Sequence, residues 1–163
     1  MIIIFFFLFL LLLENLLLPA LIGPQPFLII PTFIFSLIFY DRNTKLRLIQ
    51  AFIFLVITET FSVSGFGSMI VPFMIVVLFY LWLNRFLEIK SGLQESRSLI
   101  SLFGGAFFLT LVVLSYSYMF LFIQSSNNIM EAWQLTLILI KTSIYQIFGW
   151  ALAFVVIFKY ARK

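Results

Sequence analysis

Three ionisable side chains lie inside long apolar stretches of the chain: Glu14, Glu59 and Lys141. A charge within a membrane is costly, and it usually faces the protein interior, where it pairs or lines a polar pocket. Counting about 1.5 Å of rise per helical residue places the three at similar depths, in the outer half of a bilayer. The first interpretation is therefore an intramembrane ion pair between Lys141 and Glu59 or Glu14.

The second interpretation of these residues needs no pairing. The last apolar helix then covers only residues 142–158, and 130–140 lie flat on the membrane, so that Lys141 stays at the outer surface. Glu14 and Glu59 then simply end short helices in the headgroup layer. The sequence leaves both interpretations open.

Catalytic chemistry has little support in this sequence, which has no histidine and no cysteine. This excludes thiolate chemistry and the usual zinc and haem ligands, and it removes the commonest general base near neutral pH. Ser64 and Ser68 therefore lack the histidine that a serine nucleophile usually needs. A metal-dependent lipid-modifying enzyme needs clustered Asp or His ligands, whereas Asp41 is the only aspartate. We predict a non-enzymatic protein with no catalytic, cofactor-binding or metal site.

The composition indicates an all-α integral membrane protein. Of the 163 residues, 64% are hydrophobic and 10% are charged, against roughly a quarter charged in soluble domains. A soluble fold of this length would leave much of that apolar surface in water. No connection is long enough for a second domain, so residues 1–163 are predicted to form one membrane domain in contact with lipid. The basic residues are few and dispersed, which does not suggest nucleic-acid binding.

The hydrophobic pattern predicts a compact bundle of six transmembrane helices. The segment 2–18 lacks a basic start and a small-x-small cleavage site, so we expect a retained span rather than a cleaved signal peptide. The segment 27–40 is short, near the length at which a buried or re-entrant helix is an alternative. The six predicted spans are 2–18, 27–40, 46–61, 68–83, 99–123 and 132–158.

The basic residues set the predicted orientation, because they alternate strictly between connections. They fall in the second and fourth connections and at the C-terminus, and the other connections contain none. Cytoplasmic loops of membrane proteins carry the excess of lysine and arginine. Both termini are therefore expected in the cytoplasm. The residues concerned are Arg42, Lys45, Arg47, Arg85, Lys90, Arg97, Lys159, Arg162 and Lys163.

The segment 55–72, LVITETFSVSGFGSMIVP, is the most distinctive stretch. It carries Glu59 late in an apolar helix, then Ser62, Ser64, Gly65 and Gly67, and then the next apolar helix. Glycine adopts backbone conformations that other residues resist, so Gly65 and Gly67 predict a tight turn between two helices. Their spacing matches neither phosphate-binding glycine motif.

At this hairpin the chain resembles the MreD family of bacterial rod shape-determining membrane proteins. Those proteins have about this size, five or six spans, and an acidic residue before a short Ser/Gly turn, although the family more often has aspartate at the position of Glu59. The prolines of the first outer turn, Pro24 and Pro26, also fit the family.

The resemblance implies a non-enzymatic scaffold in the bacterial inner membrane. It would contact membrane lipids, bind an MreC-like protein as a hetero-oligomer, and help position the cell-wall synthase complex that makes peptidoglycan. The alternative is a substrate-binding membrane subunit of an energy-coupling-factor vitamin transporter, which has a similar size and helical layout. Those subunits usually present alanines in the first span, and residues 2–18 contain none.

Overall fold

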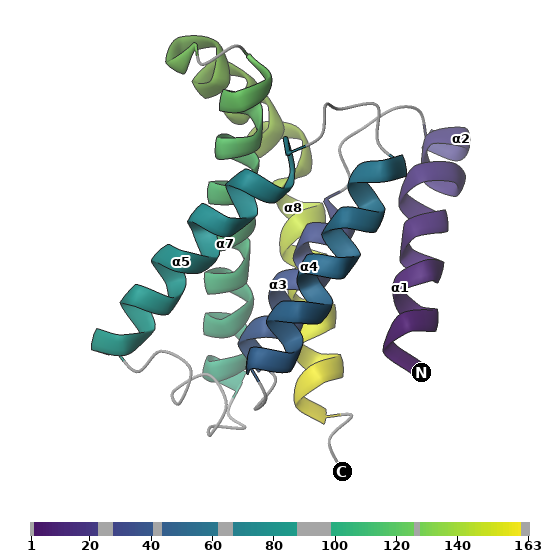
Figure 1. The fold of residues 1–163 in the computed structure, drawn as a ribbon, viewed down its shortest axis with the longest axis vertical. Helices are drawn as coiled ribbons and strands as arrows, with labels where there is room; N and C mark the ends of the chain where they lie inside the picture. Colours follow the sequence, from purple (N-terminus) through teal and green to yellow (C-terminus); the bar gives the residue numbers. More distant parts are fainter. Residues whose placement is uncertain are drawn as a thin grey trace.

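The computed structural model describes residues 2–22, 28–40, 44–61, 67–87, 99–125 and 128–160, and within these ranges it is helical with no strand. The all-helical prediction is thereby confirmed. The first helix is continuous through α1 (Ile2–Leu12), a π-helical turn η1 (Leu13–Leu17) and α2 (Leu18–Ile22) (Figure 1). The others are α3 (Ile29–Tyr40), α4 (Thr44–Phe61), α5 (Ile70–Leu87), α7 (Leu99–Gln124) and α8 (Ile129–Tyr160).

The short helix α3 is the centre of the bundle, and it packs against α1, α4, α7 and α8. Its residues 30 and 32–39 are buried, and so is its first residue, Ile29. A helix that is apolar on every side is expected to be buried on every side. Its two hydroxyls bond within the helix: Thr32 Oγ1 donates to the Leu28 carbonyl at 2.6 Å and Ser36 Oγ to the Phe33 carbonyl at 2.6 Å. Segment 27–40 thus forms a helix that is buried among the other helices.

Aromatic rings join α3 to its neighbours along its length. The ring centre of Phe33 lies 5.5 Å from that of Phe154 of α8, and the ring centre of Phe35 lies 5.7 Å from that of Tyr116 of α7. At the far end of α3, Phe39 lies 4.1 Å from Tyr80 of α5. Such ring pairs add roughly 0.5–1.5 kcal/mol each beyond the area they bury. The phenylalanines thus act as bulk packing between helices.

Within the part of the chain that the structure describes, three helices, not six, are long and apolar enough to cross a membrane. They cover Ile3–Ala20, Ser101–Gln124 and Ile129–Phe158. The apolar parts of α3 and α5, Ile29–Phe39 and Ile70–Leu83, are shorter. The remaining helix, α4, contains three charged residues within 18. The chain thus combines long helices with short ones, and the short segment 27–40 was recognisable from the sequence.

The outer surface of the bundle exposes many large apolar side chains, which is unfavourable in water. Phe5 of α1 is 64% exposed, Leu78 of α5 is 60% exposed and Phe107 of α7 is 60% exposed. Monomeric soluble proteins rarely expose contiguous apolar patches of this extent. The surface and the three long helices are compatible with an integral membrane protein.

Candidate functional site

Glu14 accepts hydrogen bonds at the start of α3. The N–H of Ile30 donates to Glu14 Oε2 at 2.6 Å, and the backbone of Leu28 and Ile29 also interacts with this carboxylate. The first N–H groups of any helix lack a partner within the helix. Here Pro31 has no N–H, and the N–H of Thr32 already bonds to the Leu28 carbonyl at 3.2 Å. Glu14 therefore serves as a long-range cap for α3.

The π-helical turn η1 surrounds Glu14. At its end, the N–H of Leu18 bonds to the carbonyl of Leu13, five residues earlier. Asn15 Nδ2 reaches back to the Leu11 carbonyl at 3.0 Å. Single π-turns inside α-helices occur frequently at functional positions because the extra residue changes the direction of the side chains. This turn accompanies the one acidic residue of the first helix.

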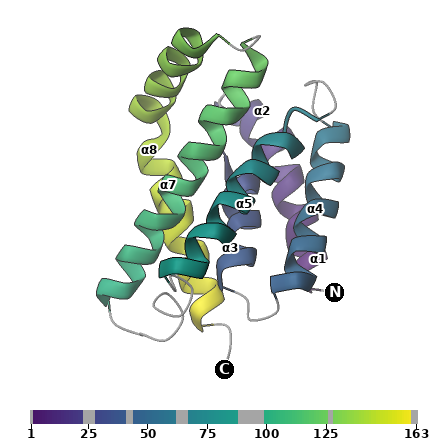
Figure 2. The same cartoon turned by 60° about the vertical axis from the view of Figure 1, so that its left-hand side comes forward.

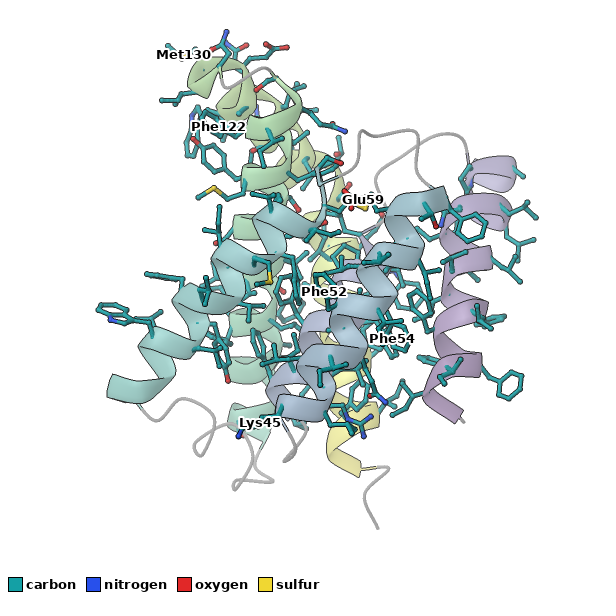
Figure 3. The ribbon with its side chains drawn as sticks, in the orientation of Figure 1. Lys45, Phe52, Phe54, Glu59, Phe122 and Met130 are labelled. Atoms are coloured by element: carbon teal, nitrogen blue, oxygen red, sulfur yellow. The ribbon has the colours of Figure 1, made fainter. Side chains whose placement is uncertain are left out.

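Glu59 has the same role at the start of α5. Glu59 Oε1 accepts a hydrogen bond from the N–H of Met69 at 2.8 Å and a longer one from Ser68 Oγ at 3.4 Å. Glu59 is only 3% exposed, and it lies at the end of α4 beside the first turn of α5 (Figure 3). A negative charge at a helix N-terminus also interacts favourably with the helix dipole.

The third helix that begins at this end of the bundle, α8, is capped locally. Asn128 Oδ1 accepts from the N–H of Met130 at 3.1 Å and from that of Glu131 at 3.4 Å. This is the usual side-chain cap of exposed helices. Only α3 and α5 among the three depend on a carboxylate from the preceding helix.

The phenol of Tyr116 of α7 interacts electrostatically with the carboxylates of both Glu14 and Glu59. Its side chain is 3% exposed. The phenol of Tyr116 therefore lies within electrostatic range of both carboxylates. The sequence gives no signal for Tyr116, because a tyrosine in an apolar helix does not differ from one that only packs.

Lys141 does not join this layer. Its side chain is exposed on α8, and among the residues that the structure describes no ion pair joins it to Glu14 or Glu59. Leu139 and Ser143, two positions before and after it, are buried, and a helix turns through about 200° in two residues. Lys141 therefore lies on the opposite side of α8 from the bundle. Residues 130–140, which the alternative interpretation places flat on the membrane, belong to the same continuous helix α8 as residues 142–158.

The predicted turn between α4 and α5 lies partly outside the described residues, which include neither Ser62 nor Ser64 nor Gly65. Gly67 is described, and its φ of +94° is a conformation that other residues rarely adopt. The N–H of Val71 donates a hydrogen bond to the carbonyl of Gly67 at 3.0 Å. Gly67 thus sets the direction in which the chain enters α5.

The arrangement binds backbone N–H groups rather than a substrate. Among the described residues, no group of three or more His, Cys, Asp or Glu could hold a metal ion. A sequence signal for the caps exists and was missed: Leu28-Ile29-Ile30-Pro31 and Met69-Ile70-Val71-Pro72 repeat one pattern, with proline at the third helical position. Comparisons with protein-family models, curated proteins and solved structures find no match.

Proposed function

We propose that this protein is a non-enzymatic membrane scaffold that acts by binding other membrane proteins. The observation that carries the proposal is the use of both interior carboxylates as caps, Glu14 for α3 and Glu59 for α5. Acidic groups committed to backbone N–H donors stabilise a fixed shape instead of performing acid–base work. A fixed helical shape with an apolar exterior suits lateral contact with other membrane proteins.

We further propose that all six helical segments cross the membrane, with both termini in the cytoplasm. The alternation of basic connections supports this topology. The caps on α3 and α5 explain how helices shorter than the membrane core can belong to such a topology. Counted from Tyr40, Ile30 lies roughly 15 Å along α3, about halfway through a ~30 Å hydrocarbon core. A helix can begin at that depth only if its first N–H groups find partners in protein, and Glu14 supplies one.

The resemblance to the MreD family supplies the finer proposal. In it, the chain resides in the bacterial inner membrane, binds an MreC-like protein, and helps position the peptidoglycan synthase complex that determines cell shape. The segment that carries the resemblance is the hairpin of α4 and α5, and Glu59 connects its two helices. This hairpin is therefore the expected partner-binding element.

The test is to tag the full chain in its native host, solubilise it gently and identify co-purifying proteins by mass spectrometry. We expect an MreC-like protein and a cell-wall synthase. Glu59→Ala should lose these partners, whereas Glu59→Gln, which keeps an acceptor oxygen for Met69, should retain them at equal membrane levels. Recovery of an ATP-driven coupling module or a stoichiometric vitamin would overturn the scaffold proposal in favour of transport.

A further inference from the structure

The exposed side of α8 carries several polar groups within its long apolar stretch. Lys141 and Gln146 are exposed, and Tyr145 is 86% exposed, the largest value among the large hydrophobic and aromatic side chains described. They follow one another at helical spacing, so that Lys141, Tyr145 and Gly149 form one line along the helix. We name Lys141, Tyr145, Gln146 and Gly149 the α8 stripe. Figure 2 shows α8 along one side of the bundle, with α7 beside it.

The α8 stripe lies at membrane depth. The apolar part of α8 ends at Phe158. Counted from there, Gln146 lies roughly 18 Å and Lys141 roughly 26 Å along the helix, inside a core ~30 Å thick. A lysine near the edge can extend its ammonium group to the headgroups. The shorter amide of Gln146 lies deeper and is not able to do so.

These positions fit contact with another helix better than contact with lipid. Polar side chains on membrane helices commonly bond across to a neighbouring helix, and small residues allow two backbones to approach closely. Gly149 is exposed, and a Cβ added there would meet nothing within 4 Å. The stripe thus offers a cation, two hydrogen-bonding groups and a site of close approach on one face.

We propose that the α8 stripe docks a transmembrane helix of a partner protein, and that this helix carries an acidic side chain in the outer half of the membrane. The charge of Lys141 selects an acidic partner. The acidic side chains of this chain's own apolar helices, Glu14 and Glu59, are held at the starts of α3 and α5 instead. The inference rests on the proposed scaffold function and names the chemistry of its partner.

A second copy of the chain fits this surface less well. Most homodimers are symmetric, with the same patch on both subunits. A symmetric contact centred on the α8 stripe would bring two Lys141 side chains together, and like charges in a membrane interface are costly. A partner with a carboxylate meets the same lysine favourably.

The absence of cysteine makes a clean cross-linking test possible. Tyr145→Cys gives the full chain a single thiol, which is labelled in native membranes with a benzophenone maleimide and irradiated. Val71→Cys is the control, because Val71 is 48% exposed on α5 and lies roughly 18 Å from Leu83, a depth close to that of Tyr145. We expect a membrane protein with an Asp or Glu in a transmembrane segment to be captured from Tyr145→Cys and not from Val71→Cys.

The charge of Lys141 is tested in the same assay. Capture at Tyr145→Cys should fall at least tenfold with Lys141→Met and persist with Lys141→Arg. Lys141→Glu should bind again when the partner's acidic residue is changed to lysine. Equal membrane levels of the variants show that they fold.

Three outcomes overturn the inference: an adduct between two copies of the chain, adducts with phospholipid alone, or capture that Lys141→Met leaves unchanged. If one of them occurs while the unmodified chain still co-purifies with membrane proteins, the docking role of the α8 stripe is wrong and the scaffold proposal survives. If the unmodified chain recovers no protein, both fail.

Discussion

The starts of α3 and α5 share one physical problem, which is that their first backbone N–H groups need acceptors inside the bundle. The two starts are capped in the same way, but the chain enters them through different residues. In both, a carboxylate from the preceding helix accepts backbone N–H groups, and a proline occupies the third helical position. At α5 the chain enters through Gly67, whose positive φ is ordinary for glycine. At α3 it enters through Leu28, whose φ of +51° is strained for a leucine.

The difference follows from where the two helices lie. The central helix α3 contacts four others, so its packing can hold a strained residue in place. In contrast, α5 packs mainly against α4 and α7, meets α3 through ring contacts such as Phe39 with Tyr80, and exposes its outer face, for example at Leu78. A peripheral helix has less packing energy to offset strain, which favours a glycine at its entry. The comparison teaches that the surrounding contacts, rather than the cap, decide how much local strain is tolerated.

The largest expected effect comes from removing a cap. Glu14→Ala leaves the first N–H groups of α3 without their acceptor inside the bundle and should lower the free energy of unfolding by about 2–4 kcal/mol. Glu59→Ala should cost about 1–3 kcal/mol, since α5 lies at the edge of the bundle. Unfolding in mixed micelles by titration with a denaturing detergent measures both. A larger loss for Glu59→Ala would contradict the ranking.

Replacing each carboxylate by its amide should have a smaller effect. Glu14→Gln and Glu59→Gln keep an acceptor oxygen and lose the negative charge, which contributes roughly 0.3–2 kcal/mol at a helix N-terminus. The same titration, compared with the alanine variants, separates the hydrogen bond from the charge. Equal losses for Gln and Ala at one site would show that the charge, and not the acceptor, maintains that helix start.

Gly67→Ala should destabilise the entry to α5 by about 1–2 kcal/mol, because an L-residue resists this left-handed conformation. No steric clash contributes, since an added Cβ has nothing within 4 Å. Gly104→Ala is the matched control: this position is helical with equally open space, so alanine there should be neutral or slightly stabilising. If both variants lose the same stability, the effect is not one of backbone conformation.

The smallest effect concerns Leu28, where Gly and Ala variants can be compared with each other. Both lose the leucine side chain, but only glycine relieves the positive φ. Leu28→Gly should therefore be more stable than Leu28→Ala by about 1 kcal/mol, the reverse of their order inside a helix. Thermal unfolding of the two purified variants is sufficient to detect the sign. Alanine as the more stable variant would mean that Leu28 is not strained.

The sequence predicts which ionisable side chains lie within the apolar helices, but it does not predict which way they face. Counting residues along apolar helices predicts similar depths for Glu14 and Glu59, and in the structure both carboxylates interact electrostatically with Tyr116. Lys141 was counted to a similar depth, yet it faces away from them. Residue counting gives height along a helix axis. It does not give the direction in which a side chain points, because that depends on which neighbours bury which face.

The sequence by itself determined that this protein is helical and apolar, since its composition leaves few charged groups and its hydrophobic runs exceed what a soluble surface tolerates. It also marked its two interior carboxylates. Only the tertiary structure decided that the shortest helix lies at the centre, that Glu14 and Glu59 cap the helices that follow them, and that Lys141 faces outward. The physical reason is that a cap of this kind joins groups ten or more residues apart in the chain, and such contacts arise only when helices pack.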